Sequence, residues 1–268
     1  MKRVKRRWVK KFTIFGNPVE HSISPKMHTF AIDGLGLQAT YTKTLIEDAC
    51  KIPSEFLENF DGANVTVPHK ESAYAMCDEV RGVAKDVKAV NTLINENGNI
   101  IGYNTDAAGF LKSMESFGEI KKVLILGAGG TAKALGVIFK QHNAQVTVLN
   151  RSKNRLAFFE DIGIEAYSWD DFELSTYDLV VNTTSAGLQE ETLPIEENIL
   201  RDIFSKTKFA TDVIYNKETP FLKLANEMDV PNKDGADMLL YQGVLAFNLF
   251  YNHAFKLDEI TKYMKKTF

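Results

Sequence analysis

Small residues at a fixed spacing near the middle of the chain are typical of a nucleotide-binding loop. Four apolar residues at 123–126 are followed by Gly127, Gly129 and Ala132, which fit the spacing G-x-G-x-x-A. The first glycine allows a tight turn, the second lets the backbone approach a pyrophosphate, and the third small residue lets a helix pack against the strand. That helix would offer unpaired N–H groups to the phosphates. The spacing predicts a dinucleotide-binding loop, the alternative being a plain strand–helix turn.

A basic segment follows the second strand of this predicted nucleotide unit. Asn150 is followed by Arg151, Lys153 and Arg155, where a fold that selects NAD carries an acidic residue for the ribose 2′-hydroxyl. Arginine offers planar, multi-donor recognition of phosphate oxygens, which suits a 2′-phosphate. The alternative is a helix start on a basic surface. We therefore favour NADP(H) over NAD(H).

Other polar residues could carry acid/base chemistry or bind a carboxylate. Lys70 follows the end of a predicted strand, where ligands collect in open α/β sheets, and a lysine there can move a proton to or from an oxygen. Asp106 could be its partner, or it could simply cap the helix that follows. Ser22 and Ser24 stand beside a helix start and could hold a carboxylate, although turn residues look the same. The histidines lack metal-ligand spacing, so we expect no metal.

Strand and helix patterns alternate along the chain, which predicts an α/β fold with parallel strands. The predicted strands are 11–15, 41–45, 62–67, 87–94, 100–103, 123–126, 145–149, 179–182 and 209–215. The predicted helices are 26–35, 55–60, 70–76, 107–117, 132–142, 155–162 and 237–255. Asn97-Gly98 predicts a hairpin between 87–94 and 100–103. The glycine-loop strand comes directly after helix 107–117, so we expect this helix to join two domains.

Composition and charge narrow the class of protein. The chain has 268 residues, 44% of them hydrophobic and 25% charged, enough for one large or two modest domains. No apolar run is long enough to cross a membrane, and two cysteines, Cys50 and Cys77, suit a reducing compartment, so we expect a cytoplasmic protein. Residues 1–11 carry seven Lys or Arg, and the remainder therefore sums to −10. We interpret the basic run as a solvated tail; binding of nucleic acid or acidic lipid is the alternative.

Several motifs, in order from about residue 12 to 250, resemble the shikimate dehydrogenase family. They are Gly16–Pro25, Asn64–Lys70, Ala89–Leu93, Gly102–Asp106, Gly127–Gly130, Asn150-Arg151, Asp212–Tyr215 with Thr219-Pro220, and the run from Asp234-Gly235 to Gln242. The resemblance implies NADPH-dependent reduction of 3-dehydroshikimate to shikimate in aromatic amino acid biosynthesis. It also implies two α/β domains that flank a cleft. These are a substrate domain, 1–106 completed by helices in 238–268, and a Rossmann-type NADP domain, 107–237. We expect a small-molecule substrate, no membrane or nucleic-acid partner, and a monomer or homodimer.

The resemblance also implies roles for individual residues. Lys70 and Asp106 match the family's catalytic pair, and Ser22 and Ser24 match the serines that hold the substrate carboxylate. Residues matching those around the substrate hydroxyls are Asn64, Thr66, Asn91, Tyr215 and Gln242. Residues matching the cofactor loops are Gly127, Ala128, Gly129, Gly130, Thr131, Asn150, Arg151, Ser152, Lys153 and Arg155, with Val213 and Gly235 near the nicotinamide.

The chain departs from the family pattern at some positions, and two other functions stay open beside the family's. Val213 stands where many members have Met, and His28-Thr29 stands where they have His-Asn. The first alternative is a quinate/shikimate dehydrogenase that uses NAD, which the basic loop after Asn150 opposes. The second is a cofactor-binding regulator without catalysis, which the presence of both Lys70 and Asp106 opposes.

Overall fold

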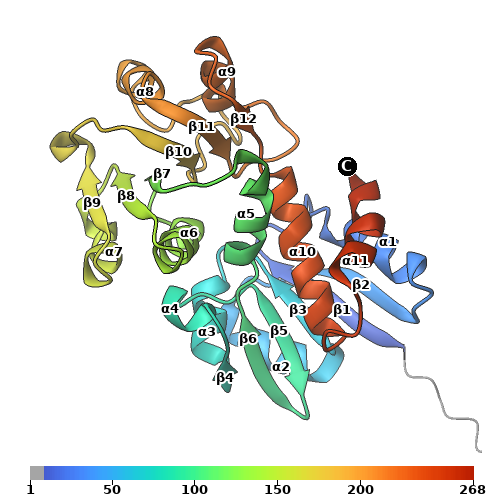
Figure 1. The fold of residues 1–268 in the computed structure, drawn as a ribbon. Coiled ribbons are helices and arrows are strands. Elements are labelled where there is room, and N and C mark those ends of the chain that lie inside the picture. Colours follow the sequence, from blue (N-terminus) through green and yellow to red (C-terminus); the bar gives the residue numbers. More distant parts are fainter. Residues whose placement is uncertain (1–8) are drawn as a thin grey trace, which may run out of the picture. The chain divides into compact units, whose positions relative to one another are not determined.

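The structure, a computed structural model, describes residues 9–268 (Figure 1). Most of the basic run that we interpreted as a solvated tail therefore lies outside the described residues. The chain forms two compact units, one containing the described residues up to Thr105 together with Gln242–Phe268, the other Asp106–Tyr241. This division falls one residue before the domain limit predicted at 106 and four after the one at 237. In the described part of the chain, no helix is long and apolar enough to cross a membrane.

The first unit is built on a mixed six-stranded sheet. Its strands run in the order β2-β1-β3-β5-β6-β4. Their bounds are β1 Lys10–Gly16, β2 Ala39–Leu45, β3 Gly62–Val65, β4 Glu79–Val80, β5 Thr92–Glu96 and β6 Asn99–Tyr103. Strand β1 pairs in parallel with β2 and β3, whereas β5 is antiparallel to both β3 and β6. The carboxyl ends of β1 and β3 therefore meet at one edge of the sheet.

Helices pack against this sheet and enclose its core. They are α1 Ser24–Gly34, α2 Ile52–Asn59, α3 Lys70–Met76, α4 Ala84–Val87 and α11 Leu257–Met264, with one-turn helices at Ala49–Lys51 and Lys265–Thr267. The core on one side gathers Phe15 and Val65 from the strands with Ile52 and Phe56 from α2, all fully or almost fully buried. Because strand side chains alternate between faces, Phe15 and Val65 point to the same side of their parallel pair.

Expectations for this unit are confirmed in part. The predicted strands 11–15, 41–45 and 62–67 pair in parallel as β1, β2 and β3, and the predicted hairpin is β5–β6, with β5 antiparallel to β3. We also predicted a strand from residue 87, but the chain forms the short helix α4 and enters β5 only at Thr92. Lys88 has a left-handed φ of 56°, and the consecutive residues Ala89 and Val90 are both buried. An apolar run can thus be buried in a loop without forming a strand.

The second unit is a parallel six-stranded sheet in the order β12-β11-β10-β7-β8-β9. Its strands are β7 Lys122–Leu126, β8 Gln145–Asn150, β9 Glu165–Ser168, β10 Tyr177–Asn182, β11 Thr207–Asp212 and β12 Asn232–Lys233. All of its strand pairs are parallel. Because β7 has β8 on one side and β10 on the other, the connections leave β7 and β10 in opposite directions. That is the doubly wound arrangement in which ligands bind at the carboxyl ends of the central strands.

Both faces of this sheet are covered. Val123 and Ile125 of β7 belong to one buried core, and Leu124 and Leu126 belong to another, as the two-residue period of a strand requires. The helices are α5 Asp106–Met114, α6 Gly130–Gln141, α7 Ala157–Asp161, α8 Glu197–Phe204 and α9 Pro220–Glu227, with one-turn helices at Glu115–Phe117, Lys153–Arg155 and Trp169–Asp171. A further helix, α10 Ala236–Phe250, contains the division between the units. The predicted α/β fold class is confirmed.

Candidate active site

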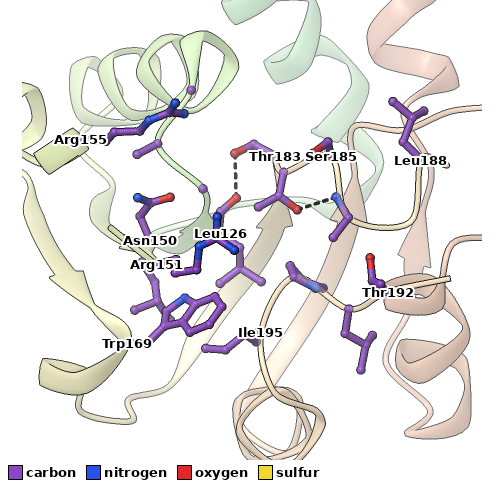
Figure 2. A pocket seen from close by; sticks show the side chains of 18 of the residues that line it. Leu126, Asn150, Arg151, Arg155, Trp169, Thr183, Ser185, Leu188, Thr192 and Ile195 are labelled. Carbon is purple, nitrogen blue, oxygen red and sulfur yellow. Dashed lines mark hydrogen bonds between the residues drawn. The ribbon is translucent and has the colours of Figure 1, made fainter. Parts of the chain in front are cut away.

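A cavity of about 840 Å³ opens at the carboxyl ends of the central strands of the second unit (Figure 2). It includes Leu126 at the end of β7 and Leu149 at the end of β8, with the turns that follow each strand. This position is the switch point of the sheet, where neighbouring connections diverge and leave space. Residues of the predicted cofactor loops that line the cavity are Gly127, Ala128, Gly129, Asn150, Arg151 and Arg155.

The glycine turn has the conformation that its sequence predicts. Gly127 adopts a φ of +106°, which favours glycine, and a Cβ there would lie 2.7 Å from the Thr183 hydroxyl. Its N–H donates to the Leu149 carbonyl at 2.9 Å, which ties the turn to β8. Gly129 precedes α6, and apart from the adjoining backbone no atom of the described residues lies within 4 Å of a Cβ built at Gly129 or Gly130. The loop backbone therefore faces open space at the start of a twelve-residue helix, with Thr131 in its first turn.

The basic segment after β8 is divided by the fold. Arg151 and Arg155 line the cavity, and the Asn150 side chain donates to the Ser152 carbonyl at 2.9 Å, which shapes the turn. Lys153, in contrast, forms an ion pair with Asp171 at 2.7 Å, outside the cavity lining. Hydrogen bonding to Asp171 raises the pKa of Lys153. Of the three cations, two are therefore placed for a bound phosphate, and the third is held by a carboxylate.

Sequence reasoning missed a large share of the cavity wall. In Figure 2, Trp169 lies on the same side of the view as Asn150 and Arg151, while Ser185, Leu188 and Thr192 lie on the other. The segment Thr183–Ala186 follows β10 directly and lines the cavity. The Thr183 hydroxyl donates to the Leu126 carbonyl at 2.7 Å, joining this segment to the end of β7. Ligands collect at the carboxyl ends of parallel strands, which makes the residues after the predicted strand 179–182 candidates, but the sequence pattern does not say that this strand lies beside β7.

A buried carboxylate organises the turn that carries Val213 and Tyr215. Asp212 is fully buried and accepts hydrogen bonds from Asn182 Nδ2 at 2.9 Å, the Thr219 hydroxyl at 2.7 Å and the Ile214 N–H at 3.0 Å. Burial raises the pKa of Asp212, and these hydrogen bonds oppose that rise. Burial also raises the pKa of the half-buried Tyr215.

Val213 and Gly235 lie together at the end of β11, although neither lines the cavity. The Gly235 N–H donates to the Ile214 carbonyl at 2.9 Å. A Cβ on Gly235 would collide with the backbone of Val213, so this position requires glycine because of close approach. The two candidate nicotinamide residues are thus held in contact by the backbone.

In the first unit, two loops meet at the carboxyl ends of β1 and β3. Gly16 lies so close to Thr66 that a Cβ would collide with the threonine methyl group. Thr66 donates its N–H to the Phe15 carbonyl at 2.8 Å. Ser22 and Ser24 follow β1, where the Ser24 N–H donates to the Ser22 hydroxyl at 3.3 Å and Ser24 begins α1. The structure thus places Ser22, Thr66 and the start of α1 at Ser24 at the same edge of the sheet.

Asn64 and Asn91 belong to one buried network in the first unit. Asn64 Nδ2 donates to the Asn91 carbonyl and to the Thr92 hydroxyl, both at 3.2 Å. Asn91 Oδ1 accepts from the Thr105 N–H at 2.8 Å. All four residues are at most 5% exposed. Two predicted substrate residues are therefore held rigidly beside the residue that precedes Asp106.

The remaining candidates are also placed by local structure. Lys70 is the first residue of α3 and half-buried, and its carbonyl accepts from the Val90 N–H at 2.9 Å, next to Asn91. Asp106 begins α5 in the second unit and is 6% exposed. Gln242 lies on α10, next to Gly243, where a Cβ would collide with Met27 of α1.

The cavity in the second unit fits a phosphorylated dinucleotide. Its open glycine backbone and helix start supply N–H donors for a pyrophosphate, and the two arginines supply donors for a further phosphate. Among the described residues, no group of three or more His, Cys, Asp or Glu is arranged to hold a metal ion.

Known proteins similar to this chain decide its family. A curated shikimate dehydrogenase (NADP(+)) from Helicobacter hepaticus is 44% identical over 242 residues, covering 89% of this chain and 90% of the relative. The chain belongs to the shikimate dehydrogenase family. A member from Desulfitobacterium hafniense is 36% identical and covers 95% of this chain and 97% of that relative. The resemblance noted from the sequence motifs is confirmed.

Solved structures and a family model agree with this membership. The shikimate 5-dehydrogenase from Thermus thermophilus, solved in complex with NADP(H) and shikimate, matches 97% of this chain and 100% of its own, with a TM-score of 0.84 and 30% identity. The model of the shikimate dehydrogenase substrate binding domain matches residues 14–93. The family match therefore includes Ser22, Asn64, Lys70 and Asn91 in the first unit.

Proposed function

We propose that this chain catalyses the NADP(H)-dependent interconversion of 3-dehydroshikimate and shikimate. The observation that carries the proposal is 44% identity to a curated NADP-dependent shikimate dehydrogenase over about nine-tenths of both chains. A match of this extent reaches into both units. The first unit would bind the substrate, because the substrate-binding model matches within it, and the second would bind NADP(H).

The residues that would hold NADP(H) follow from the cavity. The backbone of Gly127–Gly130 and the first turn of α6 would receive the pyrophosphate, and Arg151 with Arg155 would bind the 2′-phosphate. Val213 and Gly235, in contact at the end of β11, would lie against the nicotinamide. When bound, NADPH supplies the hydride that reduces the ketone carbon. We leave Lys153 out of this set, because it pairs with Asp171 and does not line the cavity.

The chemistry that falls to the chain itself is proton transfer and orientation of the substrate. Lys70 would donate a proton to the ketone oxygen during reduction and accept it in the reverse direction. Asp106 would bind a neighbouring hydroxyl and orient the lysine. Ser22 and Ser24, at the start of α1, would bind the carboxylate. The substrate hydroxyls would contact Asn64, Thr66, Asn91, Tyr215 and Gln242.

Steady-state assays with two cofactors and two substrates test this function. The purified chain is mixed with 3-dehydroshikimate and either NADPH or NADH at equal concentration, and the loss of reduced nicotinamide is followed by absorbance. The reverse reaction is measured with shikimate and with quinate. We expect turnover with NADPH and shikimate and much weaker turnover with NADH or quinate. Equal rates with NADH would instead support the quinate/shikimate enzyme that uses NAD, and no turnover would support a non-catalytic regulator.

We also propose that this chain is a cytoplasmic enzyme that acts on a small-molecule substrate. We propose further that it is a monomer or homodimer and does not bind nucleic acid. Both cysteines are free thiols, which suits a reducing compartment. Cell fractionation and sedimentation of the purified chain test these points. Strong, salt-dependent retention on DNA would contradict the proposal on nucleic acid.

A further inference from the structure

Tyr41, which no motif singled out, reaches into the candidate substrate site. It lies in the edge strand β2 opposite Phe12 of β1, whereas Asn64 lies in β3 on the other side of β1. The Tyr41 hydroxyl donates to Asn64 Oδ1 at 2.7 Å. Its ring is 7% exposed and stacks on His28, with ring centroids 4.2 Å apart. Ring and hydroxyl are therefore both held in fixed positions inside the unit.

Two backbone groups determine which atoms of this network donate and which accept. The Asn91 carbonyl can only accept, so the atom of the Asn64 amide that faces it must be nitrogen. The Thr105 N–H can only donate, so the atom of the Asn91 amide that faces it must be oxygen. The Thr92 hydroxyl then donates to Asn91 Oδ1 at 2.9 Å and accepts from Asn64 Nδ2. Amide orientation here follows from the backbone rather than from an arbitrary assignment.

The same reasoning assigns every hydrogen-bonding position of Asn64. Both N–H groups of Nδ2 are used, one on the Asn91 carbonyl and one on the Thr92 hydroxyl. Oδ1 has two lone pairs, and Tyr41 occupies one of them. Toward a ligand, Asn64 therefore has a single acceptor position and no donor.

We propose that Tyr41 is a positioning residue, which holds the Asn64 amide so that its remaining lone pair accepts a hydrogen bond from one ring hydroxyl of the substrate. This inference rests on the proposed function, since it takes Asn64 to contact a hydroxylated ring. With three hydrogen bonds the amide plane is fixed before the substrate arrives, so binding requires no ordering of that side chain. Without the Tyr41 hydroxyl, a buried acceptor loses its partner and the amide loses one of its three restraints.

The variant Tyr41→Phe isolates this role because it keeps the ring that stacks on His28. We expect the KM for shikimate to rise roughly three- to tenfold, as for the loss of one net hydrogen bond, with kcat and the KM for NADP changed less than about twofold. Tyr263→Phe on α11 of the same unit is the matched control and should change none of these. Thermal melts of all three proteins report whether the fold is kept.

Substrate analogues test the polarity of the contact. Shikimate analogues that each lack one ring hydroxyl are compared on the wild type and on Tyr41→Phe. The effect of Tyr41→Phe should vanish with one analogue and persist with the others. Replacing that same hydroxyl by fluorine, which cannot donate, should weaken binding to the wild type as much as removing it. This measurement uses the wild type alone, so it tests the single acceptor position of Asn64 even where Tyr41→Phe fails to fold.

The outcomes separate this inference from the proposed function. A wild type that does not oxidise shikimate with NADP overturns the proposed function. An active wild type with an unchanged KM in a folded Tyr41→Phe overturns the positioning role. An equal effect of Tyr41→Phe on every analogue, or fluorinated analogues that bind much better than the deoxy ones, overturns the assignment of Asn64 as a single acceptor.

Discussion

The buried imidazole of His28 makes the stability of the first unit depend on pH. His28 is 1% exposed, and its ring stacks on Tyr41 with the rings of Phe247 and Phe250 within 6 Å. In the described part of the chain, neither ring nitrogen has a hydrogen-bond partner. Burial lowers the pKa of His28 from 6.5 to about 3, because a charged ring here would lose its hydration without gaining a counter-charge. The folded chain therefore keeps this ring neutral at all but strongly acidic pH.

The sign and size of the effect follow from linkage. Between pH 6.5 and pH 3 the unfolded chain binds a proton at His28 that the folded chain does not bind. The contribution to the free energy of unfolding is thus fully present above pH 6.5 and is lost as the pH falls toward 3. At pH 5 an unfolded histidine of ordinary pKa is almost fully protonated, and the loss relative to pH 8 is about 2 kcal/mol.

Urea unfolding followed by circular dichroism at pH 8 and pH 5 measures this loss. His28→Phe keeps an aromatic ring in the stack but cannot titrate, so its free energy of unfolding should fall by about 2 kcal/mol less than that of the wild type over this interval. His253→Asn, a change at an exposed histidine, is the control and should follow the wild type. Equal losses in wild type and His28→Phe would refute the reasoning, because no proton uptake could then be assigned to this ring.

The other predictions concern the two units separately. Arg151→Ala should raise the KM for NADPH roughly 10- to 100-fold, since hydrogen bonds from a charged group to phosphate are lost, and leave the KM for NADH unchanged. Lys153→Ala should change the KM for NADPH and the KM for NADH less than about twofold, because the Lys153 ammonium already pairs with Asp171. A large effect would show that this ion pair opens for the cofactor. Lys70→Ala should lower kcat roughly 10²- to 10⁴-fold with little change in substrate Kd measured by calorimetry, whereas the exposed control Lys51→Ala should retain full turnover. Because Trp169 lines the cavity, NADPH should quench its fluorescence in a variant lacking the other tryptophan, and an unchanged signal at saturating NADPH would contradict its place in the site.

Parts of the fold that depend on neighbouring residues in the sequence could be predicted. The turn after β7 needs Gly127 because its φ is +106°, and the helix start after Gly129 follows within three residues. The hairpin at Asn97-Gly98 is equally local, since both residues have positive φ. The segment Ala89-Val90 shows the limit of such reasoning. Val90 is buried in the core of the first unit and donates its N–H to Lys70 of α3, and apolar character alone does not distinguish such a buried loop from a strand.

Parts of the site that depend on strand order could not be predicted from local pattern. Thr183–Ala186 joins the cavity because β10 lies beside β7, a pairing between segments more than fifty residues apart. Trp169 joins it from the end of β9, two strands from β7. Spacing within the sequence carries no record of which strand ends become neighbours, so both were absent from the predicted cofactor site.

Lys153 and Tyr41 show why residue type is an incomplete guide to a binding site. A cation in a basic loop was expected to bind phosphate, yet Asp171, eighteen residues later, takes that charge. A tyrosine in an edge strand carried no expectation, yet its hydroxyl restrains Asn64 across the intervening strand β1. In both cases the deciding fact is whether a donor or acceptor already has a partner inside the fold. A charged group that already pairs within the protein contributes little to binding a ligand. A side chain that hydrogen-bonds to a neighbour determines which donor or acceptor positions that neighbour still has for a ligand.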